Sequence, residues 1–187
     1  MTDRLVSIHG WNVRSAKKSL GKLVESLESL DFEVILYSYG YVFTPWSTRN
    51  TSRKVAKCLS SRIREGDTIL GHSNGGRIAW ELSYYLRVPI RRMVLINPAL
   101  DSDAIPSGMV EKCLVIHNKL DLANMASKMV PGSIWGDMGR VGYRPREDDP
   151  FGQCQRMKNM SMGAWHSPWN KDPDKYAQII RKFVDDE

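Results

Sequence analysis

The sequence predicts an α/β protein: a three-layer α/β/α sandwich with a mostly parallel central sheet. Three observations support this prediction. Short runs that are apolar throughout, such as residues 34–36, are typical of the doubly buried strands of parallel sheets. Segments with helical apolar spacing separate these runs, which is the alternation of an α/β fold. A length of 187 residues, with 42% hydrophobic and 26% charged residues, fits a single domain over residues 1–187.

Five apolar runs are predicted to form the strands of this sheet. They span residues 5–8, 32–37, 67–70, 92–96 and 112–117. From residue 131 to residue 168 the sequence mixes glycine, proline, charge and methionine without a period, over a stretch too long for an idle loop. We expect this stretch to be partly structured and to help form the site, with strands around residues 133–135 and 141–143.

Helices are predicted between the strands and after them. They span residues 15–30, 48–64, 74–86 and 172–185, with a short additional helix at residues 123–129. The first helix has one apolar stripe, formed by Leu20, Leu23, Val24, Leu27 and Leu30. We expect the last helix to begin after Asp172 as its N-cap, with Pro173 at its first position.

The pattern G-x-S-x-G lies between the third strand and the third helix. Residues 71–75 read Gly-His-Ser-Asn-Gly, and Gly76 follows. This pattern is typical of a strained strand-to-helix turn that lifts one side chain above the end of a sheet. The serine in such a turn usually has a positive φ, and its neighbours must be small because strand and helix crowd them. Ser73 is therefore the predicted nucleophile.

A serine nucleophile needs a base within hydrogen-bond reach, and the base needs an acid that orients it. His166, in a loop just before the last helix, is the predicted base, since it follows both the serine and the candidate acids. Asp121, a few residues after the strand at 112–117, is the predicted acid. Asp101 and Asp103, which follow the preceding strand, remain the alternatives.

Two main-chain N–H groups are predicted to bind the oxyanion that forms during acyl transfer. Asn74 follows the nucleophile and lies at a helix N-terminus, where the helix dipole favours negative charge. Trp11 is the second predicted donor, since it follows the first strand, where Gly10 allows close approach of the backbone.

This combination of motifs resembles the α/β-hydrolases. The resemblance rests on residues 9–11 (His-Gly-Trp), the Gly-rich turn at residues 71–76, Asp121 and His166. It implies a serine hydrolase that cleaves carboxylic esters through an acyl-enzyme, with no cofactor and no metal. Because the chain begins at the strand before His9 and has no long insertion after residue 98, we expect a minimal form of that fold without a large cap domain. The alternatives are a thioesterase or acyltransferase with the same triad, and a non-catalytic binding protein that retains the fold.

An aromatic, irregular segment after the second strand is expected to form the rim of the site together with the late segment before His166. The rim residues would be Tyr39, Tyr41, Phe43, Trp46 and Trp165. Such side chains suit an apolar acyl or aryl group of a small-molecule ester.

The bulk composition narrows the function classes further. The net charge is +6 with a pI near 9.3, but Lys and Arg are spread along the chain, so we expect a basic solvated surface and no nucleic-acid partner. Three widely spaced cysteines without a C-x-x-C pair argue against a disulfide framework and a zinc site. No apolar run approaches about 18 residues, so no membrane span is expected. The absence of a visible signal peptide favours the cytoplasm, and the oligomeric state is left open.

Overall fold

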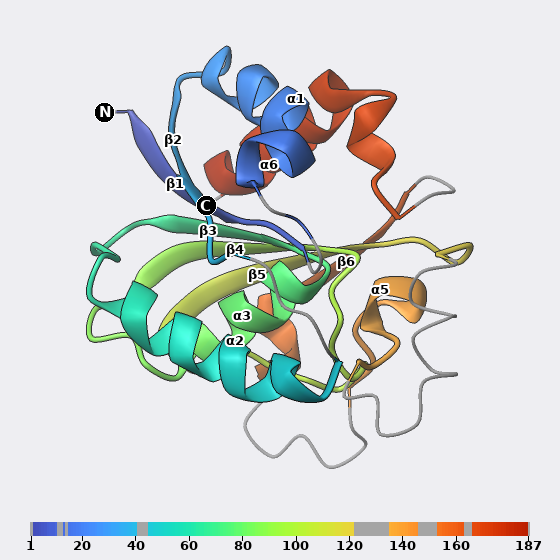
Figure 1. Ribbon diagram of the computed structural model, residues 1–187. Helices are drawn as coiled ribbons and strands as arrows, with labels where there is room; N and C mark the ends of the chain where they lie inside the picture. The colour runs from blue at the N-terminus through green and yellow to red at the C-terminus, as the bar shows by residue number, and fades with distance from the viewer. Residues whose placement is uncertain are drawn as a thin grey trace.

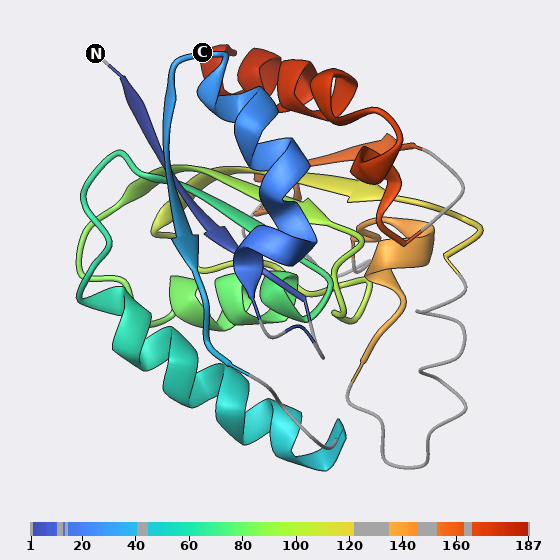
Figure 2. The ribbon, with the colours of Figure 1, turned by 45° about the horizontal axis from the view of Figure 1, so that its top comes forward.

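The computed structural model describes residues 2–10, 13, 15–40, 45–121, 135–145, 153–162 and 166–186. It shows a three-layer sandwich whose central sheet has six parallel strands in the order β2-β1-β3-β4-β5-β6. Helices α1 and α6 cover one face of the sheet, and α2 and α3 cover the other (Figures 1 and 2). The predicted fold class is confirmed, and the sheet is parallel throughout the described strands rather than mostly so.

The strands are, in chain order, β1 (Asp3–Ile8), β2 (Phe32–Tyr37), β3 (Thr68–His72), β4 (Ile90–Ile96), β5 (Val110–His117) and β6 (Met157–Ser161). The first five lie where the apolar runs predict them, with ends shifted by no more than about two residues. Strands β3, β4 and β5 are buried along most of their length, because helices cover both faces of the sheet. Since all strands are parallel, the residues after their carboxyl ends meet at one edge.

The sixth strand was not predicted, and the strand expected at residues 141–143 is wrong. Residues 141–143 are not extended: Met138–Val141 form the short helix α5, which ends before Gly142 at φ 78°. Trp135 lies outside any strand, and residues 133–134 lie outside the described residues. β2 and β6 are the two edge strands of the sheet, and both are only partly buried. β6 escaped prediction because, unlike β2, it interrupts its two methionines with polar residues and has no continuous apolar run.

The main helices are α1 (Ala16–Glu28), α2 (Pro45–Ser60), α3 (Asn74–Ser83) and α6 (Pro173–Asp185), with 3-10 turns η1 (Gln153–Arg156) and η2 (Pro168–Asn170). The predicted cap of α6 is confirmed, because the Asp172 carboxylate accepts a 3.2 Å hydrogen bond from the Lys175 N–H and Pro173 begins the helix. The short helix expected at residues 123–129 lies outside the described residues. No helix among the described residues is both long and apolar enough to cross a membrane.

Two apolar cores hold the layers together, one on each face of the sheet. The first joins α2 and α3 to the sheet through residues such as Leu59, Ile78 and Leu82. The second joins α1 and α6 to the sheet through residues such as Leu20 and Ile180. Burying each aliphatic side chain of this kind contributes about 1.5–3 kcal/mol. These cores fix the strand register, which in turn fixes the positions of the loops at the carboxyl edge.

Candidate active site

Ser73 occupies the sharp turn between β3 and α3. Its backbone has φ 54° and ψ −119°, a region that costs a non-glycine residue about 1–3 kcal/mol. The turn is held on both sides: the Ser73 N–H donates to the Ile96 carbonyl at 3.0 Å, and the Ser73 carbonyl accepts from the N–H groups of Gly76 and Ala99, each at 3.0 Å. The surrounding backbone therefore supports the strained conformation that the G-x-S-x-G pattern predicts.

The glycines around Ser73 are required by close backbone packing. A Cβ atom at Gly75 would lie 2.2 Å from the Ile8 carbonyl oxygen, and one at Gly71 would lie 2.6 Å from the Gly75 carbonyl oxygen. A Cβ atom at Gly76 would lie 2.8 Å from Cβ of Pro98. No side chain fits these distances without moving the backbone, so the expected demand for small residues is confirmed.

The structure pairs His166 with Asp121 rather than with the alternative acids. The Nδ1 atom of His166 lies 2.8 Å and 2.9 Å from the two carboxylate oxygens of Asp121. Asp121 follows β5 and is fully buried, whereas 26% of the His166 side chain is exposed. This geometry places the N–H on Nδ1 and leaves Nε2 as the acceptor atom.

Two side chains, one at the end of β3 and one just after β4, hold the backbone of His166. Its carbonyl accepts a 2.8 Å hydrogen bond from the Asn97 side-chain amide and a 3.2 Å bond from Nε2 of His72. The rings of His72 and His166 lie 4.8 Å apart, so the imidazole of His166 lies beside the residue that precedes Ser73. Asn97, in the turn after β4 with φ 44°, was not singled out from the sequence. The dipeptide Asn97-Pro98 directly after a buried strand could have indicated a tight turn at this position, since asparagine tolerates positive φ.

His72 is buried and electrically neutral. Its Nε2–H donates to the His166 carbonyl, its ring meets Trp169 edge-on at 4.4 Å, and its buried Nδ1 has no hydrogen-bond partner among the described residues. Burial, followed by repulsion from His166, lowers the pKa of His72 well below its usual value. Its side chain therefore supports the backbone at His166.

Folding stability is expected to fall as the pH drops below about 6.5, because the unfolded chain takes up a proton on His72 that the folded protein excludes. Because the pKa of His72 is lower in the folded protein than in the unfolded chain, the contribution of the neutral imidazole to the free energy of unfolding is fully present above about pH 6.5 and is lost as the pH falls below that value. The slope of the unfolding free energy against pH that one such group contributes approaches 1.4 kcal/mol per pH unit, which corresponds to the uptake of about one proton on unfolding. Urea unfolding between pH 7.5 and 5 measures this slope. His72→Gln should reduce this pH slope by the equivalent of about one proton. An unchanged slope would contradict the claim that the buried imidazole of His72 stays neutral in the folded protein.

Gly10 brings the end of β1 against the nucleophile. A Cβ atom at Gly10 would lie only 3.2 Å from Cβ of Ser73, so the main chain at Gly10 borders Ser73 directly. Tyr39, an expected rim residue, is half-buried, and its hydroxyl contacts the carbonyl of Gly10 and the side chain of Asn74. Four of the other predicted site residues lie outside the described residues: Trp11, Tyr41, Phe43 and Trp165. The side chain of Trp46 is not described either.

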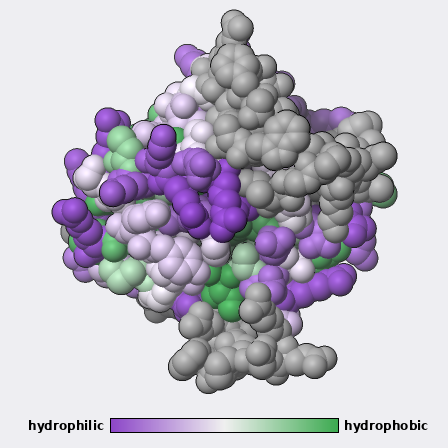
Figure 3. Space-filling view, turned by 60° about the horizontal axis from the view of Figure 1, so that its bottom comes forward, coloured by the Kyte–Doolittle hydropathy of each residue, from purple (hydrophilic) through white to green (hydrophobic). Residues whose placement is uncertain are grey.

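A charged cavity lies between α2 and α3. On this face of the molecule the described residues are largely hydrophilic (Figure 3). The cavity, of about 330 Å³, is lined by three arginines, two carboxylates and two tryptophans; the charged residues are Arg49, Arg53, Arg77, Glu81 and Asp101. Arg77 lies about one helical turn after Ser73. Asp101 therefore faces guanidinium groups here, which accounts for an aspartate at this position without a role as the orienting acid.

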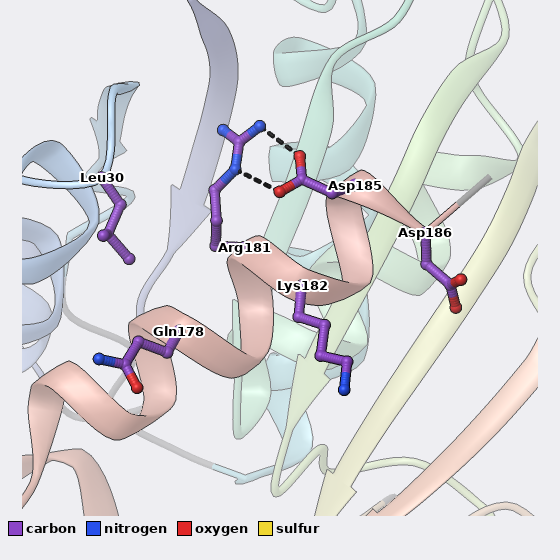
Figure 4. Close-up of a pocket in the computed structure, with 6 residues that line it drawn as sticks. All are labelled: Leu30, Gln178, Arg181, Lys182, Asp185 and Asp186. Carbon is purple, nitrogen blue, oxygen red and sulfur yellow. Dashed lines mark hydrogen bonds and ion pairs between the residues drawn. The ribbon is translucent and has the colours of Figure 1, made fainter.

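A second hollow, of about 480 Å³, lies at the opposite edge of the sheet (Figure 4). Arg181, one of its lining residues, binds the Asp185 carboxylate on the same helix and Asp3 at the start of β1, so the hollow lies near the amino end of that strand. It contains no nucleophile or histidine among its lining residues. Among the described residues, no group of three or more His, Cys, Asp or Glu side chains is arranged to hold a metal ion.

Comparison with known proteins identifies the fold. The sequence matches no protein-family model, and no curated protein matches it. Solved structures match it over nearly the whole chain. A lipase-esterase related protein from Clostridium acetobutylicum ATCC 824 aligns with a TM-score of 0.64 at 13% identity, covering 97% of this chain and 94% of that chain.

Two further solved structures have the same fold over nearly the whole chain. An esterase from Exiguobacterium antarcticum aligns with a TM-score of 0.61 at 10% identity, covering 98% of this chain and 92% of that chain. The monoacylglycerol lipase of Paleococcus ferrophilus aligns with a TM-score of 0.61 at 14% identity, covering 97% and 93%. The chain therefore has the fold of the α/β-hydrolases.

Proposed function

We propose that this protein is a serine hydrolase that cleaves carboxylic esters through Ser73, His166 and Asp121. The observation that supports this most strongly is the pair of hydrogen-bond distances, 2.8 Å and 2.9 Å, between His166 Nδ1 and the buried Asp121 carboxylate. The carbonyl of that same histidine is bonded to His72, which precedes Ser73, and to Asn97, in the turn after β4. An imidazole oriented by a buried acid, 4.8 Å from the ring of the residue that precedes the serine, supports this triad, because serine acyl transfer requires a base oriented in this way.

In the first half of the proposed reaction, Ser73 Oγ attacks the carbonyl carbon of the ester. Nε2 of His166 takes the hydroxyl proton, and Asp121 stabilises the imidazolium while remaining ionised. The carbon–oxygen bond of the ester then breaks, and the His166 Nε2–H protonates the departing alkoxide. The products of this half are the free alcohol and an ester between the acyl group and Ser73.

In the second half, a water molecule replaces the alcohol. His166 removes a proton from the water, the resulting hydroxide attacks the acyl carbon, and the proton passes to Ser73 Oγ as the carboxylic acid leaves. The oxyanion formed in each half would be bound by the main-chain N–H of Asn74, at the first position of α3, and by that of Trp11.

Carboxylic esters are the proposed substrate class because the structural neighbours include an esterase and a monoacylglycerol lipase. We test this with 4-nitrophenyl acetate, butyrate and octanoate. The expected result is a burst of nitrophenolate stoichiometric with protein, followed by a slower steady rate limited by hydrolysis of the acyl-enzyme. Faster release with an added alcohol than with water would assign acyl transfer instead. No hydrolysis above the buffer rate for any ester would contradict the proposal.

A further inference from the structure

We propose that Tyr39 is a positioning residue that holds the oxyanion-binding backbone against Ser73, through the Gly10 carbonyl and the Asn74 side chain. This inference rests on the proposed function, since it concerns the groups that would bind the oxyanion. It also gives Tyr39 a role other than the substrate rim expected from the sequence.

The hydroxyl of Tyr39 bridges two separate segments beside the nucleophile. It donates a 2.8 Å hydrogen bond to the Gly10 carbonyl, after β1, and accepts a 3.2 Å bond from Nδ2 of Asn74, the first residue of α3. Tyr39 itself follows β2, so three elements meet at one oxygen atom. Burial raises the pKa of Tyr39 to about 12, so the hydroxyl keeps the proton that it donates throughout the neutral range.

His9 reinforces the hydrogen bond between Tyr39 and the Gly10 carbonyl. Its ring stacks on that of Tyr39 with centroids 4.2 Å apart and an interplanar angle of 4°, and the residue is fully buried. Nδ1 of His9 lies 2.8 Å from the Gly10 carbonyl oxygen, and Nε2 lies 3.4 Å from the Tyr39 N–H. Both contacts are satisfied when Nδ1 carries the proton and Nε2 accepts. Burial lowers the pKa of His9, which favours this neutral form.

The Gly10 carbonyl is thus held by two donors, the Tyr39 hydroxyl and the His9 Nδ1–H. A peptide group is planar, and in its trans form the carbonyl and the N–H of the next residue point in opposite directions. Fixing the carbonyl therefore fixes the direction available to the amide that follows Gly10, which is the donor predicted from the sequence. The main chain here borders Ser73, because a Cβ atom at Gly10 would lie 3.2 Å from the serine Cβ.

Both ends of the Tyr39 bridge act on the proposed oxyanion donors. One end holds the Gly10 carbonyl, whose peptide group would carry the first proposed donor, and the other restrains Asn74, whose own N–H is the second. Preorganised donors stabilise a transition state because they need no reorientation as charge develops. Loss of the bridge should therefore weaken binding of the oxyanion more than binding of the uncharged ester.

The test is Tyr39→Phe, which removes the hydroxyl and retains the ring that stacks on His9. The matched control is Tyr84→Phe, which removes a 2.8 Å bond from a tyrosine hydroxyl to the Ile105 carbonyl at an exposed position. We measure kcat and KM for 4-nitrophenyl butyrate, the inhibition constant of an aryl trifluoromethyl ketone, and Tm. The trifluoromethyl ketone forms a hemiketal oxyanion on the serine, so its affinity reports oxyanion binding.

For Tyr39→Phe, we expect kcat to fall about 10-fold with KM changed less than about 2-fold, below the 10²–10³-fold cost of deleting a donor outright. The affinity for the trifluoromethyl ketone should fall by the same factor as kcat, and Tm should change no more than in the control. Unchanged kcat and ketone affinity would overturn the inference. A loss that appears only in KM, or that Tyr84→Phe reproduces, would do the same.

The two proposals fail in distinguishable ways. If the wild-type protein hydrolyses the ester and binds the ketone, but Tyr39→Phe has the same kcat and ketone affinity as the wild type, only the positioning role of Tyr39 is wrong. If the wild-type protein neither hydrolyses esters nor reacts with the ketone, the proposed function itself is wrong, and the positioning role is rejected with it.

Discussion

Replacement of Ser73 by alanine is expected to lower the rate of ester hydrolysis by about 10⁴–10⁶-fold, because the acyl-enzyme cannot form without the hydroxyl. The residual rate would come from oxyanion binding and substrate positioning alone. Alanine also has a Cβ, so the turn keeps the same steric cost at φ 54° and the fold should be unchanged. Initial rates with 4-nitrophenyl butyrate and a thermal melt measure both effects.

The matched control is Ser61→Ala, which removes an exposed serine hydroxyl that donates to the Cys58 carbonyl at 3.1 Å. Its activity should equal that of the wild-type protein. Retention of more than about one-tenth of the wild-type rate by Ser73→Ala would show that hydrolysis does not proceed through this serine, since loss of a nucleophile costs orders of magnitude more.

Asp121→Asn is expected to reduce kcat by about 10³–10⁴-fold with little change in KM. The substitution preserves the size of a fully buried side chain, so packing around it should survive. An amide, unlike a carboxylate, donates as well as accepts. It can therefore hold His166 with the proton on Nε2, the atom that must receive the serine proton. The carboxylate that stabilises the imidazolium is also lost. Steady-state kinetics across several ester concentrations separates kcat from KM.

Asp101→Asn is the control for this prediction, because Asp101 was an alternative acid and instead lines the charged cavity beside α3. We expect its kcat within about 3-fold of wild type, because His166 is paired with Asp121 and the change removes a charge that faces the arginines of the cavity. If Asp101→Asn caused the large loss and Asp121→Asn the small one, the pairing in the structure would not be the one used in catalysis.

The parts of the fold that could be predicted are those with a strong local signal. A run such as residues 94–96 predicts a buried strand, because few other environments accept three consecutive branched aliphatic residues, and these residues are fully buried in β4. The turn at Ser73 was predictable because its strain requires glycines at fixed offsets. The pair of Asp121 and His166 followed from chain order and from the meeting of parallel strand ends at one edge, and the structure brings these two side chains together.

The parts that could not be predicted depend on contacts between distant segments. β6 mixes methionine with lysine, asparagine and serine, so it carries no continuous apolar run, and only its pairing with β5 makes it a strand. Asn97 and His72 hold the His166 carbonyl across 69 and 94 positions of sequence, and no local pattern encodes such a bond. The Tyr39 bridge is of the same kind: an aromatic residue in a glycine-containing segment predicts an exposed rim as readily as a hydroxyl that bonds two other segments.

The central claim is that Ser73 is an activated nucleophile, and labelling with a fluorophosphonate tests it most directly. The reagent forms a stable phosphonyl ester only with a serine whose hydroxyl is activated by a base. Mass spectrometry of the intact protein and of its tryptic peptides would show how many labels bind and where. The account predicts a single label on Ser73 in the wild-type protein, slower labelling of His166→Ala and none of Ser73→Ala. An unlabelled wild-type protein, or a label that persists in Ser73→Ala, would contradict it.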